Sequence, residues 1–275
     1  MDSDADRRVA VAERAARAGA VVASERFRTG LDFETKDGPT DVVTQADRDA
    51  QREASEVIAA SFPGETIVGE EGDAEKRVPD DGPVWVIDPI DGTNNYVADI
   101  PVWTTSVAAV VDGEPVGAAN VAPAMDATYL VGPEGFTFNG APASVSERTK
   151  PAASTLAPIL WWSRDERAEY CEVTCRIVER FDDMRRFGST QLALSFVATG
   201  ALDGAINTVA SDPWDTIAGV AMIREAGGTV TDVAGDRWRH DSDGLVASNG
   251  LIHDAVLEAA QEARATVRDA SEREP

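Results

Sequence analysis

The chain has 275 residues, of which 43% are hydrophobic, so it is long enough to bury a core in one domain or in two lobes. It carries 25 basic and 49 acidic side chains, which give a formal net charge of −24 and exclude the basic surface that binding to a nucleic-acid backbone needs. Because the acids are spread along the chain, we expect a halophilic protein, with a surface suited to a high-salt cytoplasm; a moderately acidic protein from a GC-rich genome is the alternative.

The N-terminal residues and the cysteines bear on the compartment. The first residues, MDSDADRR, are charged, which is not typical of a signal peptide, and no apolar run is long enough to span a membrane. Cys171 and Cys175 are four residues apart in a helical pattern, where a disulfide is geometrically poor, so we expect packed thiols. The sequence therefore predicts a cytoplasmic protein without membrane contact.

Two helices are predicted early in the chain, over 3–28 and from Gln45 to Phe62, because small apolar residues recur there at helical spacing. A polar segment with Gly and Pro lies between them. Its Lys36 is either a solvated lysine or a residue on the substrate side. Asp47 lies in the first turn of the second helix, where an acid by itself indicates a cap.

A first strand that is followed directly by carboxylates is predicted over 66–68. It ends at Gly69-Glu70-Glu71-Gly72. Neighbouring side chains in an extended segment point in opposite directions, so only one of the two glutamates can reach a metal ion.

A second strand of this kind is predicted over 84–88. Pro89 is expected to stop its pairing, and the residues Asp91-Gly92-Thr93 are expected to turn the chain. The two carboxylates of Asp88 and Asp91 favour a cation, while backbone N–H groups at the start of the following short helix favour an anion. This turn is therefore predicted to bind a metal ion and a phosphate.

The rest of the chain divides into a meander and an alternating region. Strands of the meander are predicted over 104–111, 116–121, 127–131, 135–139 and 143–146. Residues 148–154 mark a boundary between an N-terminal lobe, 1–150, and a C-terminal lobe, 151–275. In the second lobe strands alternate with helices, which is typical of a layered α/β fold. The strands are predicted over 155–160, 184–187, 204–209, 229–232 and 245–248, and the helices over 164–181, 191–199, 212–227 and 251–268.

Four carboxylates are candidates for a metal site: Glu70, Asp88, Asp91 and Asp215. Hard oxygen ligands without a Cys or His cluster select Mg²⁺, Mn²⁺ or Ca²⁺ rather than Zn²⁺, and His240 and His253 are expected at the surface. An EF-hand is excluded, because Ile90 and Gly92 stand where it needs oxygen-bearing side chains. Walker A, dinucleotide-binding and G-x-S-x-G motifs are absent from the sequence.

Three motifs resemble the signatures of the inositol monophosphatase family: Gly69-Glu70-Glu71, Asp88-Pro89-Ile90-Asp91-Gly92-Thr93, and Trp214-Asp215 with Ala218-Gly219. The likeness runs from about residue 8 to residue 262, and the middle motif is highly specific. The resemblance implies an α/β (α+β) fold, built as a layered αβαβα sandwich of the sugar phosphatase type. It also implies a homodimeric, Mg²⁺-dependent phosphomonoesterase that acts on a small sugar or polyol phosphate.

The resemblance implies a role for each motif residue. Two or three Mg²⁺ ions, with Mn²⁺ as a substitute, would be held by Glu70, Asp88, the Ile90 carbonyl, Asp91 and Asp215. The attacking water would be oriented by Asp47, Glu70 and Thr93, and the phosphate would be held by backbone N–H groups of Gly92 and Thr93. The expected substrate contacts are Lys36, Asp91, Arg186, Ser189 and Asn207.

The substrate stays open between inositol 1-phosphate and fructose 1,6-bisphosphate. Inositol phosphatases carry a glutamate shortly before the Trp-Asp motif, and here that position falls on Asn207 or Thr208. Arg185 and Arg186 either face a second phosphate or lie on a solvated edge. A 3′(2′),5′-bisphosphate nucleotidase of the same superfamily and a non-catalytic phospho-ligand binding protein are the alternatives. A calcium-stabilised structural protein is disfavoured, because it would leave Thr93 without a role.

Overall fold

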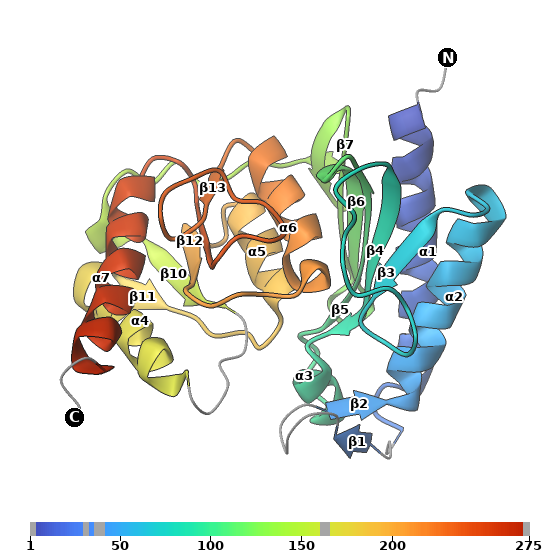
Figure 1. Cartoon of the computed structure of the whole chain (residues 1–275), viewed down its shortest axis with the longest axis horizontal. Helices are drawn as coiled ribbons and strands as arrows, with labels where there is room; N and C mark the ends of the chain where they lie inside the picture. Colours follow the sequence, from blue (N-terminus) through green and yellow to red (C-terminus); the bar gives the residue numbers. More distant parts are fainter. Residues whose placement is uncertain (1–3, 30–32, 36–41, 160–165, 272–275) are drawn as a thin grey trace.

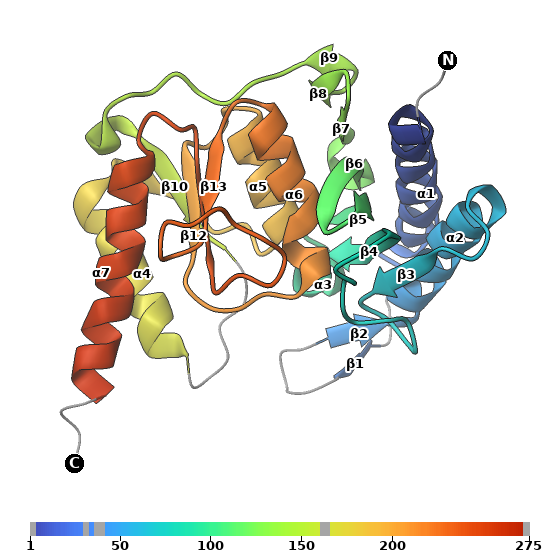
Figure 2. The ribbon, with the colours of Figure 1, turned by 45° about the horizontal axis from the view of Figure 1, so that its top comes forward.

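Helices and sheets alternate in five layers across the molecule (Figures 1 and 2). The computed structural model describes residues 4–29, 33–35, 42–159 and 166–271. Two helices, α1 (Asp4–Arg26) and α2 (Gln45–Ser61), cover the outer face of a large sheet. The middle layer between the sheets is formed by α5 (Thr190–Ala198) and α6 (Pro213–Glu225), and the far layer by α4 (Arg167–Arg180) and α7 (His253–Ser271). The predicted αβαβα sandwich is confirmed.

The large sheet has seven strands in the order β3-β4-β5-β6-β7-β8-β9. In chain order they span Thr66–Gly69, Pro83–Asp91, Thr104–Val111, Glu114–Ala122, Ala127–Gly132, Gly135–Phe138 and Ala141–Pro142. β3 and β4 are parallel, and the later pairs are antiparallel. The strand predicted over 143–146 does not form, because the chain leaves the sheet there and the Val145 N–H donates to the Ala226 carbonyl at 3.1 Å. A separate two-stranded ribbon pairs β1 (Phe33–Thr35) with β2 (Val42–Thr44).

Both faces of the large sheet are buried. On β4, Trp85 and Ile87 belong to the core shared with α1 and α2, whereas Val84 and Val86 belong to the core shared with α5 and α6. This two-sided burial explains the uninterrupted apolar run over 84–87, because a strand covered on one face only would alternate apolar and polar residues.

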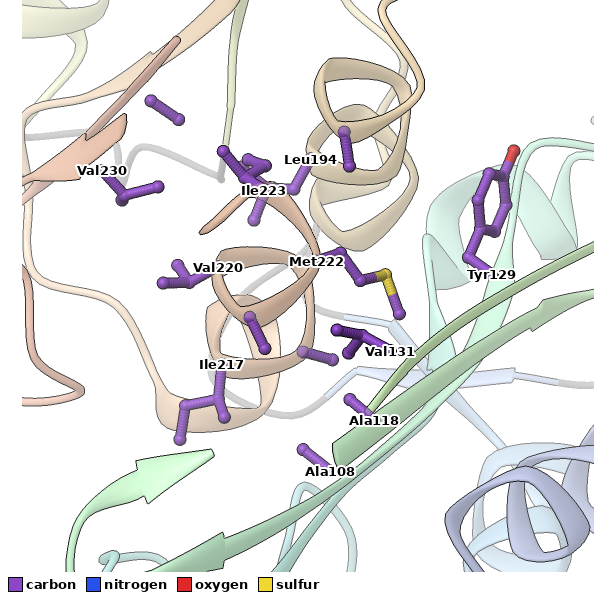
Figure 3. Close-up of a cluster of buried hydrophobic side chains, with 14 of the residues drawn as sticks. Ala108, Ala118, Tyr129, Val131, Leu194, Ile217, Val220, Met222, Ile223 and Val230 are labelled. Atoms are coloured by element: carbon purple, nitrogen blue, oxygen red, sulfur yellow. The ribbon is translucent and has the colours of Figure 1, made fainter. Parts of the chain in front are cut away.

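The core between α6 and the large sheet sets the position of the middle layer (Figure 3). Met222 of α6 is directed toward Val131, and the small side chains of Ala108 and Ala118 lie on the neighbouring strands. Small residues on the sheet allow a helix to approach closely. Since α6 begins next to Asp215, this packing also fixes the height of that carboxylate above the sheet.

The smaller sheet has five strands in the order β11-β10-β12-β14-β13. They are β10 (Thr155–Pro158), β11 (Asp183–Met184), β12 (Gly204–Asn207), β13 (Thr229–Thr231) and β14 (Leu245–Ser248). Its outer face packs against α4 and α7 through Val173, Ile177 and Val256. The chain passes from the larger sheet to the smaller one between Pro142 and Thr155, and the division into lobes 1–150 and 151–275 remains a prediction. Among the described residues, no helix combines the length and the apolar character that crossing a membrane requires.

The end of β4 differs from the prediction. Pairing with β5 continues past Pro89 to Asp91, opposite Thr104, with an irregular register between Asp88 and Asp91. The Pro89 carbonyl accepts a hydrogen bond from the Thr105 hydroxyl at 2.8 Å. A proline, which has no N–H, is tolerated at a bulge, so the prediction that Pro89 ends the pairing is wrong.

Two side-chain predictions are also wrong. Cys171 and Cys175 are exposed on α4 instead of packed. His253, expected at the surface, is 8% exposed at the start of α7. Its ring pairs with the hydroxyls of Ser248, at 3.0 Å, and Thr231, at 3.1 Å. Two hydroxyls on adjacent strands of the smaller sheet therefore satisfy a ring that the sequence pattern could not place.

Candidate active site

Three carboxylates meet where the two halves of the molecule face each other. One oxygen each from Asp88, Asp91 and Asp215 lies within 4.8 Å of the other two. Asp88 and Asp91 come from the irregular end of β4, whereas Asp215 comes from the first turn of α6. Pro213 starts that helix, where its missing N–H costs nothing. The bulge of one sheet and the start of a helix far along the chain thus form one acidic cluster.

The cluster is electrostatically unfavourable without a cation. Burial raises the pKa of Asp88 well above its ordinary value, and the charges of Glu70, Asp91 and Asp215 raise it further. Burial likewise raises the pKa of Asp215. Oδ1 of Asp88 is buried without a hydrogen-bond partner among the described residues, which is rare for a carboxylate oxygen. A position lined by carboxylate oxygens, one of which lacks a hydrogen-bond donor among the described residues, fits a hard divalent cation such as Mg²⁺.

Asp91 is held by the start of α5. Its carboxylate accepts the backbone N–H groups of Thr190, at 3.1 Å, and Gln191, at 2.8 Å, and the hydroxyl of Ser189. Burial raises the pKa of Asp91 to about 6, although these hydrogen bonds act in the opposite direction. Ser189, predicted as a substrate contact, therefore contacts Asp91 directly.

Glu70 follows β3 and acts on the cluster through its charge. Its charge acts on both Asp88 and Asp215. The next residue, Glu71, is 5% exposed, and Gln51 of α2 clamps its backbone: the Glu71 N–H donates to Oε1 of Gln51 at 2.8 Å, and Nε2 of Gln51 donates to the Glu71 carbonyl at 2.7 Å. A Cβ at Gly69 would lie 2.7 Å from the same Gln51 oxygen, so a larger residue there would displace the Gln51 side chain.

Asp47 uses its two oxygens for two purposes. Oδ2 accepts from the Thr44 N–H at 2.8 Å and the Thr44 hydroxyl at 2.6 Å, which completes a capping box on α2. Oδ1 lies 3.4 Å from the Thr93 hydroxyl, which is also 3.0 Å from the Ile90 carbonyl. The cap and the site role are thus compatible, because they involve different atoms.

Gly92 lies between Asp91 and the short helix α3 (Thr93–Val97). Its φ of +98° is in the left-handed region that favours glycine, and a Cβ there would lie 2.9 Å from the Val102 carbonyl. The first N–H groups of α3 have no acceptor within the helix, as at any helix start. The turn predicted from Asp91-Gly92-Thr93 is therefore present.

The remaining predicted substrate contacts have different surroundings. Asn207 is fully buried, and its side-chain amide bonds to the backbone of Val209 through both its nitrogen and its oxygen. Arg186 is exposed, and Arg185 pairs with Asp183 on β11. Lys36 falls outside the described residues.

Three positioning residues escaped the sequence reasoning: Thr44, Gln51 and Gln191. The spacing of Thr44 and Asp47 is a capping-box pattern, so this pair could have been found. Gln191 donates to the Trp214 carbonyl at 2.6 Å and accepts from the Gly219 N–H at 2.9 Å, which joins α5 to α6. No local pattern indicates Gln51 or Gln191, because their partners are distant in sequence.

Comparisons with known proteins identify the family of the chain. A model of the inositol monophosphatase family matches residues 4–265. Fructose-1,6-bisphosphatase/inositol-1-monophosphatase of Thermotoga maritima is 36% identical over 234 residues, which cover 83% of this chain and 86% of that protein. Inositol-1-monophosphatase of Bacillus subtilis is 30% identical over 243 residues, covering 88% and 91%.

Solved structures lead to the same family. The structure of an inositol monophosphatase from Thermotoga maritima superposes with a TM-score of 0.84 at 32% sequence identity, covering 92% of this chain and 96% of that one. The residues matched by the family model, 4–265, include all three motifs. On this evidence the chain belongs to the inositol monophosphatase family.

Proposed function

We propose that this protein is a Mg²⁺-dependent phosphomonoesterase that hydrolyses a small sugar or polyol phosphate in the cluster of Asp88, Asp91 and Asp215. Membership of the family makes it a phosphoric monoester hydrolase. The observation that carries the metal dependence is the convergence of three carboxylate oxygens within 4.8 Å. One of the three residues, Asp88, also has an oxygen for which the described part of the chain offers no hydrogen-bond partner. Mg²⁺ would be held by these residues together with Glu70 and the Ile90 carbonyl.

When bound, Mg²⁺ supplies positive charge that activates a water molecule and stabilises the leaving oxygen. The chain's own residues do the rest. The Thr93 hydroxyl, set between Oδ1 of Asp47 and the Ile90 carbonyl, can donate to Asp47 and accept a hydrogen bond from a water. Asp47 and Thr93 thereby orient the attacking water, and the Asp47 carboxylate can assist as a general base. Glu70 is proposed to help in orienting the same water.

The phosphate is proposed to lie against Gly92 and Thr93. Gly92 brings the backbone close to the cluster, and the start of α3 offers N–H donors to an anion. Asp91 and Ser189 border the same position from the other side. A substrate here contacts elements of both halves of the chain.

The sugar or polyol part of the substrate is proposed from the names of the relatives. Two of them are named for inositol 1-phosphate and one of these also for fructose 1,6-bisphosphate. Asn207 does not replace the missing glutamate, since its amide is bound to Val209. Arg186 is exposed and carries a charge that suits a second phosphate. We therefore place fructose 1,6-bisphosphate alongside inositol 1-phosphate.

The test is phosphate release from three substrates after removal and restoration of Mg²⁺. Inositol 1-phosphate, fructose 1,6-bisphosphate and 3′-phosphoadenosine 5′-phosphate distinguish the polyol, sugar and nucleotide activities by their relative kcat/KM. We expect hydrolysis of at least one of the first two. Release from the nucleotide alone would favour the nucleotidase, and release from none would favour a non-catalytic binding protein.

We also propose that the protein is a cytoplasmic, halophilic homodimer. The net charge of −24 supports adaptation to salt, because ions screen the repulsion among surface acids. Circular dichroism and light scattering across a salt series test these points together. We expect a loosened fold in dilute buffer and twice the monomer mass in high salt; a full signal in dilute buffer contradicts halophily, and a monomer mass contradicts the dimer.

A further inference from the structure

Lys76 contacts both the segment that contains Glu70 and the segment that contains Asp215. It lies in the loop between β3 and β4, and its ammonium donates to two consecutive carbonyls, those of Gly69 at 2.7 Å and Glu70 at 2.9 Å. The same nitrogen lies 5.5 Å from the centre of the Trp214 ring. A cation within about 6 Å of an aromatic face is attracted to it.

These contacts join two segments that are far apart in sequence. Glu70 follows β3 at the edge of the large sheet, whereas Trp214 precedes Asp215 in the first turn of α6. The loop itself is tied to β3, because the Gly69 N–H donates to the Glu75 carbonyl at 3.1 Å. A lysine in this loop is therefore held next to both segments, although its own side chain is exposed.

The geometry points to Lys76 as a positioning residue for the metal site, which it serves by holding the backbone of Glu70 and the ring of Trp214 in one arrangement. Trp214 is 9% exposed and is followed directly by a cluster carboxylate. Moving either segment would change the distance between Glu70 and Asp215. Groups that orient metal ligands change metal affinity 10- to 100-fold when they are lost.

A neutral side chain cannot replace this lysine. Methionine matches the length of its stem but offers no donor to the two carbonyls and no charge to the ring. Arginine keeps the charge and several donors, so it should restore part of the function. Lys150 provides a matched control, since it is an exposed lysine in the segment that leads to β10.

The inference rests on the proposed function, and its test reads metal binding separately from hydrolysis. Mn²⁺ binding to Lys76→Met, Lys76→Arg and Lys150→Met is measured by electron paramagnetic resonance on the full chain, alongside the melting temperature without metal. We expect about tenfold weaker Mn²⁺ binding in Lys76→Met, partial recovery in Lys76→Arg, and no change in Lys150→Met. The melting temperature of the metal-free protein should stay the same in all three.

Enzyme kinetics give a second readout. In Lys76→Met the Mg²⁺ concentration for half-maximal activity should rise about tenfold, while kcat at saturating Mg²⁺ stays within about twofold of the wild type. Mn²⁺ affinity of Lys76→Met equal to that of Lys150→Met would overturn the inference and leave the proposed function intact. A wild type that binds no Mn²⁺ would overturn both.

Discussion

The Ser189 hydroxyl donates a hydrogen bond to Oδ2 of Asp91 and so joins α5 to the end of β4. The same hydroxyl accepts the Leu192 N–H at 3.3 Å, as the N-cap of α5. One side chain thus starts a helix and orients a carboxylate of the cluster, which couples the middle layer of the sandwich to the site.

Replacing Ser189 with alanine removes both bonds. We expect the free energy of unfolding to fall by about 2 kcal/mol, because an N-cap contributes about 1 kcal/mol and a hydrogen bond to a carboxylate somewhat more. Urea denaturation measures the loss. Ser189→Thr keeps a hydroxyl and should lose less than half as much, so equal losses in the two variants would contradict the assignment.

Thr93 is expected to act through its hydroxyl rather than its shape. Thr93→Val keeps the volume but cannot bond to Asp47, and we expect kcat to fall about 100-fold, the lower end of what general acid–base groups contribute. Thr93→Ser restores the hydroxyl and should recover most of the activity. Similar rates in the valine and serine variants would mean that packing, not the hydroxyl, matters.

Gly92→Ala should destabilise the protein for two reasons that a control can separate. Left-handed backbone costs a non-glycine residue about 1–2 kcal/mol, and the new Cβ would approach the Val102 carbonyl to 2.9 Å. Gly227 has a similar φ of +91°, and a Cβ at that position would meet nothing within 4 Å, so Gly227→Ala measures the backbone cost alone. We expect Gly92→Ala to be the more destabilised of the two in thermal unfolding, and equal losses would rule out the close approach.

His253 should make stability depend on pH. Burial lowers the pKa of its ring below the ordinary value, so the unfolded chain binds a proton more readily than the folded one. The stabilisation that neutral His253 gives to the folded state is therefore complete above about pH 6.5, the pKa in the unfolded chain, and is lost as the pH falls below that value. His253→Gln should flatten the fall in melting temperature between about pH 7 and pH 5. An unchanged slope would show that other groups cause it.

The sequence predicted the elements whose residues are buried in a regular pattern, and it failed where distant partners decide. The strand over 245–248 and the helix that starts at Gln45 were predicted closely, because their apolar spacing and flanking residues are local signals. The extension of β4 past Pro89 depends on pairing with β5 through Thr104, which no local pattern reveals.

The same distinction holds for the site. The cluster of Asp88, Asp91 and Asp215 followed from motifs of a known family, and the structure brings these three side chains together. Asn207 was predicted as a substrate contact from its position shortly before the Trp-Asp motif, whereas its amide bonds to the backbone of Val209, two residues further along the chain. Burial of His253 depends on hydroxyls from two strands, β13 and β14, which contact the start of its helix.

The central claim is that the carboxylate cluster hydrolyses a phosphate ester with Mg²⁺, and phosphate release by Asp88→Asn tests it most directly. Oδ1 of Asp88 lacks a hydrogen-bond partner within the described residues. The amide variant removes the charge of this carboxylate with little change in volume. Asp182→Asn, at an exposed position, is the matched control. We predict that Asp88→Asn loses more than about 100-fold in kcat/KM with saturating Mg²⁺, beyond the effect of losing a group that only orients a ligand, while Asp182→Asn stays within about twofold of the wild type. Phosphate release by Asp88→Asn at the rate of Asp182→Asn would contradict the account.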